Sequence, residues 1–64
     1  MSEKILEEAG FKFIEGEWVK GDWTIRLIHN MIEVFNKITS KEPRYFFGSE
    51  EKLKEIIEAI NTSA

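Results

Sequence analysis

The sequence contains no cysteine, one histidine and one proline among 64 residues. Without cysteine there is no disulfide and no thiolate metal site, and one histidine leaves too few ligands for a usual zinc site. No apolar run reaches membrane-spanning length, and Met1 to Ala9 is rich in glutamate where a signal peptide would be apolar. We therefore expect a cytoplasmic protein with no membrane segment, no metal and no cofactor.

Absence of cross-links matters because the chain is short. A domain of this size buries only about 60% of the surface that its unfolded chain exposes, so a net stability of only a few kcal/mol is expected. Large side chains offset this, since the sequence carries five Phe, two Trp and one Tyr. We expect one small domain over residues 1–64. Self-association is another common route to stability, and a homodimer is an open alternative.

Charge of one sign does not dominate. The net charge is −3, from twelve acidic and nine basic residues, and the acidity lies in the two terminal segments. This balance argues against a dedicated nucleic-acid binder, which normally has a basic face. The central region nevertheless contains aromatic residues suited to base stacking and six cations, so a weak nucleic-acid binder is a further alternative. The cations are Lys12, Lys20, Arg26, Lys37, Lys41 and Arg44.

Both ends of the chain carry helix signals. Residues 3–9 are expected to form a short helix that Ser2 caps and Gly10 ends, with Phe11 folding back onto its last turn. A second helix begins after Ser49, and its apolar residues recur at the spacing of one helical face. These residues are Leu53, Ile56, Ile57 and Ile60.

Between the helices, runs rich in aromatic and β-branched residues predict an antiparallel meander of four strands. The runs are 11–14, 17–20, 22–28 and 31–36, and they are separated by the turn signals Glu15-Gly16, Gly21-Asp22 and His29-Asn30. Residues 44–47 (RYFF), which follow Pro43, predict a possible short fifth strand. The sequence does not indicate where this strand pairs.

Two-residue turns fix the register of the strands, and this register collects most large apolar residues on one face. We expect this face to be covered by both helices, which gives an α+β fold with both helices on one face of the sheet. Both tryptophans then belong to the core and not to a ligand platform. The predicted core face comprises Phe13, Trp18, Trp23, Ile25, Leu27, Ile32 and Val34.

The opposite face is mixed and is the candidate partner-binding surface. It pairs Arg26 with Glu33 across two strands, and we interpret its apolar residues as a patch with a charged rim. One of Phe46 and Phe47 is expected to join it. The alternative is that Thr24, Arg26 and Glu33 interrupt the patch and leave it without function. The candidate residues are Ile14, Val19, Arg26, Ile28, Met31, Glu33 and Phe35.

Catalytic signals are weak. His29 lies in a turn with no residue in the sequence that would orient its ring, and there is no phosphate loop or nucleophile motif. We expect no enzyme. In its general character only, and through no specific motif, the chain resembles the small proteins of bacterial chromosomes, prophages and other mobile elements. The sequence therefore favours a non-catalytic protein–protein interaction or regulatory module of bacterial or phage origin.

Overall fold

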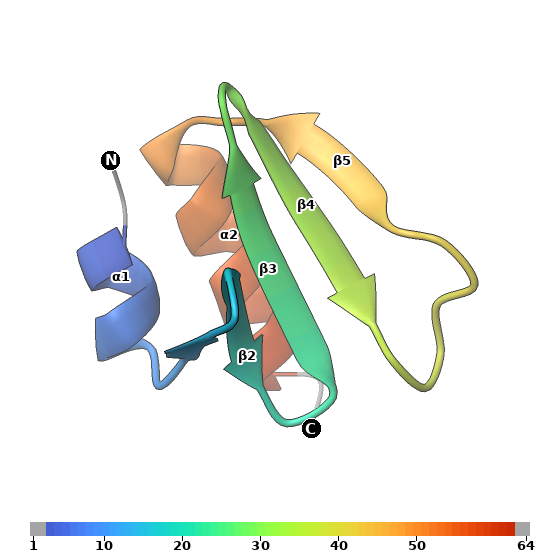
Figure 1. The fold of residues 1–64 in the computed structure, drawn as a ribbon. Coiled ribbons are helices and arrows are strands. Elements are labelled where there is room, and N and C mark those ends of the chain that lie inside the picture. Colours follow the sequence, from blue (N-terminus) through green and yellow to red (C-terminus); the bar gives the residue numbers. More distant parts are fainter. Residues whose placement is uncertain (1–2, 63–64) are drawn as a thin grey trace.

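The computed structural model describes residues 3–62 and confirms the α+β fold. The five strands form one open antiparallel sheet in the order β1-β2-β3-β4-β5, so the fifth strand is real and pairs with β4. Figure 1 shows the strands following one another across the sheet. The elements are α1 (Glu3–Glu8), β1 (Lys12–Ile14), β2 (Glu17–Lys20), β3 (Trp23–Ile28), β4 (Met31–Asn36), β5 (Arg44–Phe47) and α2 (Glu50–Thr62).

The three predicted hairpins have the predicted register. Trp18 lies opposite Phe13 and Ile25, and Arg26 lies opposite Glu33. The turn Glu15-Gly16 has positive φ at both residues, as the right-handed twist of the strands favours. At His29, φ is also positive (51°), so a non-glycine residue occupies a left-handed position at the β3–β4 turn.

Helix α1 ends as predicted. The Gly10 N–H donates to the Glu7 carbonyl and the Phe11 N–H donates to the Leu6 carbonyl, which is the double hydrogen bond of a Schellman motif. Gly10 has a φ of 98°, and Phe11 is buried. The predicted Ser2 cap lies outside the described residues. These two hydrogen bonds connect the end of α1 to Phe11, the residue before β1.

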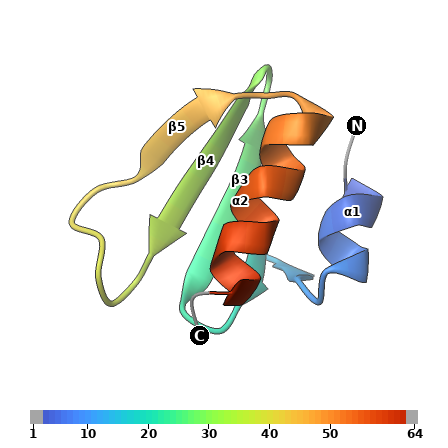
Figure 2. The same cartoon turned by 180° about the vertical axis from the view of Figure 1, so that it is seen from behind.

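Helix α2 begins at the predicted cap, where the Ser49 hydroxyl accepts a hydrogen bond from the Lys52 N–H. In Figure 2 this helix lies in front of the sheet, with α1 beside it. Both helices contribute to one hydrophobic cluster, so they cover the same face, as predicted. Its buried members are Leu6, Phe11, Trp18, Ile25, Ile32, Val34, Leu53, Ile56, Ile57 and Ile60.

The predicted core face is wrong at one position. Phe13 lies on the helix side of the sheet by register, but 61% of the residue is exposed. It belongs to β1, an edge strand of three residues, and its ring contacts Trp18 at a centroid distance of 5.1 Å. The tryptophans also differ, since Trp18 is buried whereas Trp23 is only half-buried.

A lysine on the helix side joins three elements. The Lys20 ammonium donates hydrogen bonds to the Ala9 carbonyl and to Asn61 Oδ1, both at 2.7 Å. It therefore satisfies a carbonyl at the end of α1, where the helix dipole favours a cation, and it holds the last turn of α2. The aliphatic part of Lys20 can pack at the edge of the core while the charge stays at the surface.

Replacing Lys20 by methionine keeps much of the apolar volume but removes both hydrogen bonds. We expect Lys20→Met to lower the free energy of unfolding by about 1–3 kcal/mol, measured by urea denaturation. Lys54→Met is the control, because Lys54 is exposed on α2 and a change there stays within about 0.5 kcal/mol. Equal stabilities for the two variants would contradict this role of Lys20.

Candidate functional site

The face of the sheet opposite both helices carries the predicted partner-binding residues, and we call it the open face. All seven candidates lie on it by register. Strand β5 adds Tyr45 beside Glu33 and Phe47 beside Met31. The open face consists of Lys12, Ile14, Glu17, Val19, Thr24, Arg26, Ile28, Met31, Glu33, Phe35, Tyr45 and Phe47.

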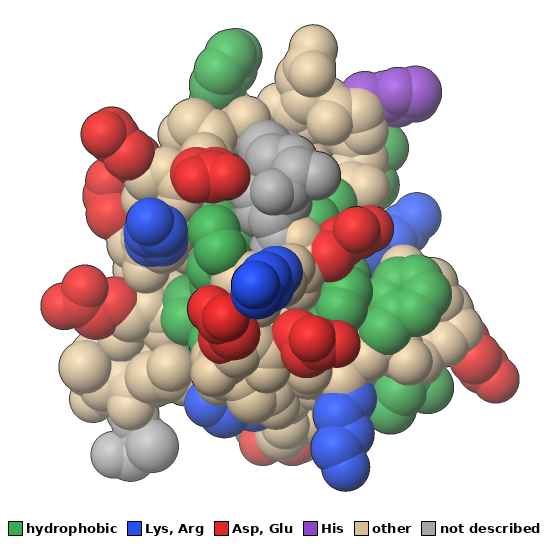
Figure 3. All heavy atoms as spheres, turned by 90° about the vertical axis from the view of Figure 1, so that its left-hand side faces the viewer, with side chains coloured by type: hydrophobic (Ala, Val, Ile, Leu, Met, Phe, Trp, Pro, Cys, Tyr) green, Lys and Arg blue, Asp and Glu red, His purple; other side chains and the backbone are tan. Residues whose placement is uncertain are grey.

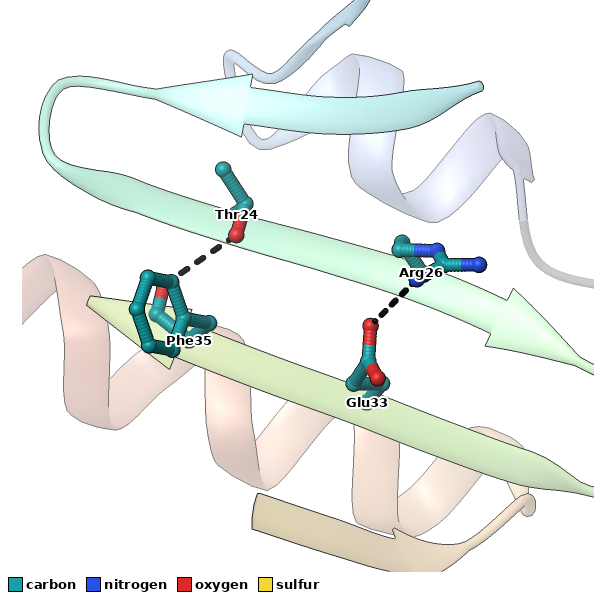
Figure 4. A network of polar contacts seen from close by, with 4 residues as sticks. All are labelled: Thr24, Arg26, Glu33 and Phe35. Carbon is teal, nitrogen blue, oxygen red and sulfur yellow. Dashed lines mark hydrogen bonds and ion pairs between the residues drawn. The ribbon is translucent and has the colours of Figure 1, made fainter. Parts of the chain in front are cut away.

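A polar row crosses the middle of the open face. Arg26 Nη1 lies 3.1 Å from Glu33 Oε1, so the predicted ion pair is present (Figure 4). The Glu33 side chain is only 11% exposed. Hydrogen bonding to Glu33 is the main cause that raises the pKa of the Tyr45 phenol, and desolvation adds to it. The row is therefore a joined set of groups from β3, β4 and β5.

This row divides the apolar residues into two groups, which differs from the expected patch with a charged rim. On one side, Val19 and Phe35 are both half-buried and flank Thr24, whose hydroxyl donates to the Phe35 carbonyl at 3.3 Å. On the other side, Ile28 lies directly opposite Met31. Ile14 is exposed on β1 and joins neither group. The ion pair is central because its two residues occupy the inner strands β3 and β4.

The second group is more exposed and reaches the sheet edge. Ile28, Met31 and Phe47 are successive partners across β3, β4 and β5, and we call them the tip cluster. Met31 is 42% exposed and Phe47 is 77% exposed. The sequence left open which of Phe46 and Phe47 joins the open face, and the register places Phe47 there. The sequence shows that Phe46 and Phe47 point to opposite faces of β5. It does not show which face each one takes, because the pairing of β5 was unknown.

The free edge of β5 is poorly suited to pairing with another strand. The Gly48 N–H donates to the Asn30 carbonyl, and the alternation of an antiparallel ladder then turns the backbone groups of Tyr45 and Phe47 outward. However, the Phe47 carbonyl already accepts from the Ser49 N–H, and Pro43, which precedes the strand, has no N–H. Such features protect sheet edges. Contacts through side chains of the open face are therefore favoured over strand addition.

No family model, curated protein or solved structure matches this chain. Neither helix within residues 3–62 is long and apolar enough to cross a membrane. Over the same residues, His, Asp and Glu side chains form no group of three that could hold a metal ion.

Two of the six cations considered for nucleic-acid binding are already engaged. Lys20 donates to Ala9 and Asn61, and Arg26 is paired with Glu33. On the face drawn in Figure 3, acidic and basic side chains are interspersed. Phosphate binding needs uncompensated cations, so the engagement of Lys20 and Arg26 weakens the nucleic-acid alternative at these two positions.

Proposed function

We propose that this protein is a non-catalytic binding module that engages another protein through the tip cluster of its open face. The observation that carries the proposal is the exposure of Met31 and Phe47 at adjoining register positions on the face opposite both described helices. Single exposed apolar residues are ordinary on protein surfaces, whereas contiguous exposed apolar patches are typical of interaction sites.

The chemistry around the tip cluster also suits an interface. Aromatic residues and methionine are enriched at the centres of protein interfaces, and polar groups form their rims. Here Tyr45 and the Arg26–Glu33 pair border the cluster on one side. A partner with an apolar anchor and a polar surround would match this pattern, with the anchor lying on Phe47 and Met31.

The test is affinity capture from a lysate of the source organism with wild type and Phe47→Asp in parallel. Since Phe47 is mostly exposed, the variant is expected to fold, with an unfolding free energy within about 0.5 kcal/mol of wild type. We expect a stoichiometric partner with wild type and at least a tenfold loss in the variant, because a charge would enter an apolar contact. Phe35→Asp is less suitable, because Phe35 is half-buried.

Ile38→Asp is the matched control. Ile38 is also highly exposed (73%) but lies in the loop between β4 and β5, outside the open face. Capture that Phe47→Asp retains, or that Ile38→Asp loses equally, would overturn the proposal. Sedimentation of the same samples tests the homodimer alternative, since a concentration-dependent dimer that Phe47→Asp abolishes would identify a second copy as the partner.

A further inference from the structure

A groove lies on the helix side of the sheet, on the opposite side from the open face. Five strands spaced about 4.8 Å apart span about 19 Å, of which α2 with its side chains covers about 10 Å, and α1 lies on the side of α2 away from β4 and β5. In Figure 2, α2 lies over β3, and β4 and β5 extend beyond it. The uncovered half of the sheet follows from the topology and is not a packing defect.

The groove is formed by two adjoining hollows that share Trp23, Val34 and Arg44. One, of about 320 Å³, lies between α2 and β4–β5 and is otherwise lined by Phe46, Ile56, Ala59 and Ile60. The other, of about 480 Å³, lies beneath the loop that leads to β5 and includes Lys41, Glu42 and Pro43. Pockets for small molecules have similar volumes, with apolar walls and a few polar groups. We call this the Trp23 groove.

The exposure of the lining shows that the groove is accessible. Trp23 and Phe46 are half-buried although they face the helix side with the core residues Ile25 and Ile32. Trp18, by contrast, lies under the helices and is buried. An aromatic ring at the floor of an open groove offers a large apolar contact to a ligand. The ligand-platform interpretation, which the sequence disfavoured for both tryptophans, is therefore restored for Trp23 alone.

The charged groups indicate the kind of ligand. Arg44 lies where the two hollows meet, is exposed, and forms no ion pair within the described residues 3–62. Lys41 adds a second cation and Glu42 one anion, so the groove has an excess of positive charge in a protein whose net charge is negative. A guanidinium binds a carboxylate with two parallel hydrogen bonds. An apolar body beside Trp23 and a carboxylate at Arg44 would satisfy both parts of the groove.

We propose that the Trp23 groove binds a small amphipathic carboxylate, with its apolar body against Trp23 and Val34 and its carboxylate on the Arg44 guanidinium. This site is independent of the proposed protein-binding function, because it lies on the opposite side of the sheet from the tip cluster.

Titration of the ¹⁵N-labelled protein with octanoate, and separately with 1-octanol, tests the site. The two tryptophans give two indole N–H signals, assigned with Trp23→Phe. We expect octanoate to shift the Trp23 signal saturably while that of Trp18 stays in place. Octanol is expected to bind about tenfold more weakly, because it cannot form the charge-assisted pair. Arg44→Gln should weaken octanoate binding by the same factor and leave octanol binding unchanged.

A second variant blocks the groove without touching its charge. Ala59 lines the groove from the exposed side of α2, so Ala59→Phe is expected to fill it and abolish octanoate binding. Glu58→Phe, at a neighbouring exposed position outside the lining, is the control and should bind normally. Phe47→Asp should also bind octanoate normally, so failure of the open-face proposal would leave this test intact.

Three results would overturn the proposal. An unshifted Trp23 signal would show that the groove takes no such ligand. Parallel shifts of both indole signals would indicate non-specific partitioning into the core. Equal affinities for octanoate and octanol would remove the role of Arg44.

Discussion

An Ile25→Ala variant is expected to be largely unfolded at temperatures where the wild type is folded. Ile25 is fully buried at the centre of β3, and it lies between Trp18 on β2 and Val34 on β4. Truncation of such a side chain costs about 3–4 kcal/mol through lost burial and the cavity left behind. A domain of 64 residues is expected to have a total stability of only a few kcal/mol, so one substitution removes most of it.

Urea denaturation followed by tryptophan fluorescence measures this loss. Ile38→Ala removes the same atoms from a residue that is mostly exposed, and its effect should stay within about 0.5 kcal/mol. A loss of less than about 1 kcal/mol for Ile25→Ala would mean that the core around β3 is not closely packed.

The second large effect is expected at Gly48, where a methyl group has no room. An added Cβ would lie 2.7 Å from the Asn30 carbonyl oxygen and 2.8 Å from its carbon. Both atoms are backbone, so no side-chain rotation can relieve the clash. The same residue donates its N–H to the Asn30 carbonyl and connects β5 to the Ser49 cap of α2. We expect Gly48→Ala to cost about 2–3 kcal/mol.

Gly21→Ala is the control that distinguishes the steric clash expected at Gly48 from the cost of a left-handed backbone conformation. Gly21 has a φ of 60°, but an added Cβ there would meet nothing within 4 Å. Its cost should therefore be only the left-handed penalty of about 1 kcal/mol. Amide spectra add a structural readout, since Gly48→Ala should shift the signals of Asn30 and Met31 whereas Gly21→Ala should not. If Gly48→Ala proved as stable as Gly21→Ala, the contact between β5 and the β3–β4 turn would not be tight.

Gly48 also bears on the proposed function. Its neighbour Phe47 and the neighbour of Asn30, Met31, are cross-strand partners in the tip cluster. A displacement of β5 from the turn would separate these two side chains. Gly48→Ala is thus expected to reduce partner capture as well as stability, in contrast to Phe47→Asp, which should reduce capture alone.

The sequence by itself determined the local structure of this protein. Turn pairs such as Glu15-Gly16 fix hairpin register, because a two-residue loop leaves only one alignment that keeps apolar residues on one face. Gly10 and Ser49 likewise mark helix ends through bonds to residues within one turn. These are short-range effects, which neighbouring residues suffice to specify.

Only the tertiary structure decided which surfaces are exposed and which groups meet. The loop before β5 carries no signal that sets the register of β5. The pairing of β5 with β4, and therefore the face on which Tyr45 and Phe47 lie, depends on the whole sheet. The exposure of a side chain depends on which elements pack over it. Trp18 is buried under the helices, whereas Phe13 at the sheet edge and Trp23 beyond α2 are more exposed, although all three lie on the same face. The proposed groove lies where α2 leaves β4 and β5 uncovered, and the proposed protein-binding surface lies on the sheet face opposite both described helices.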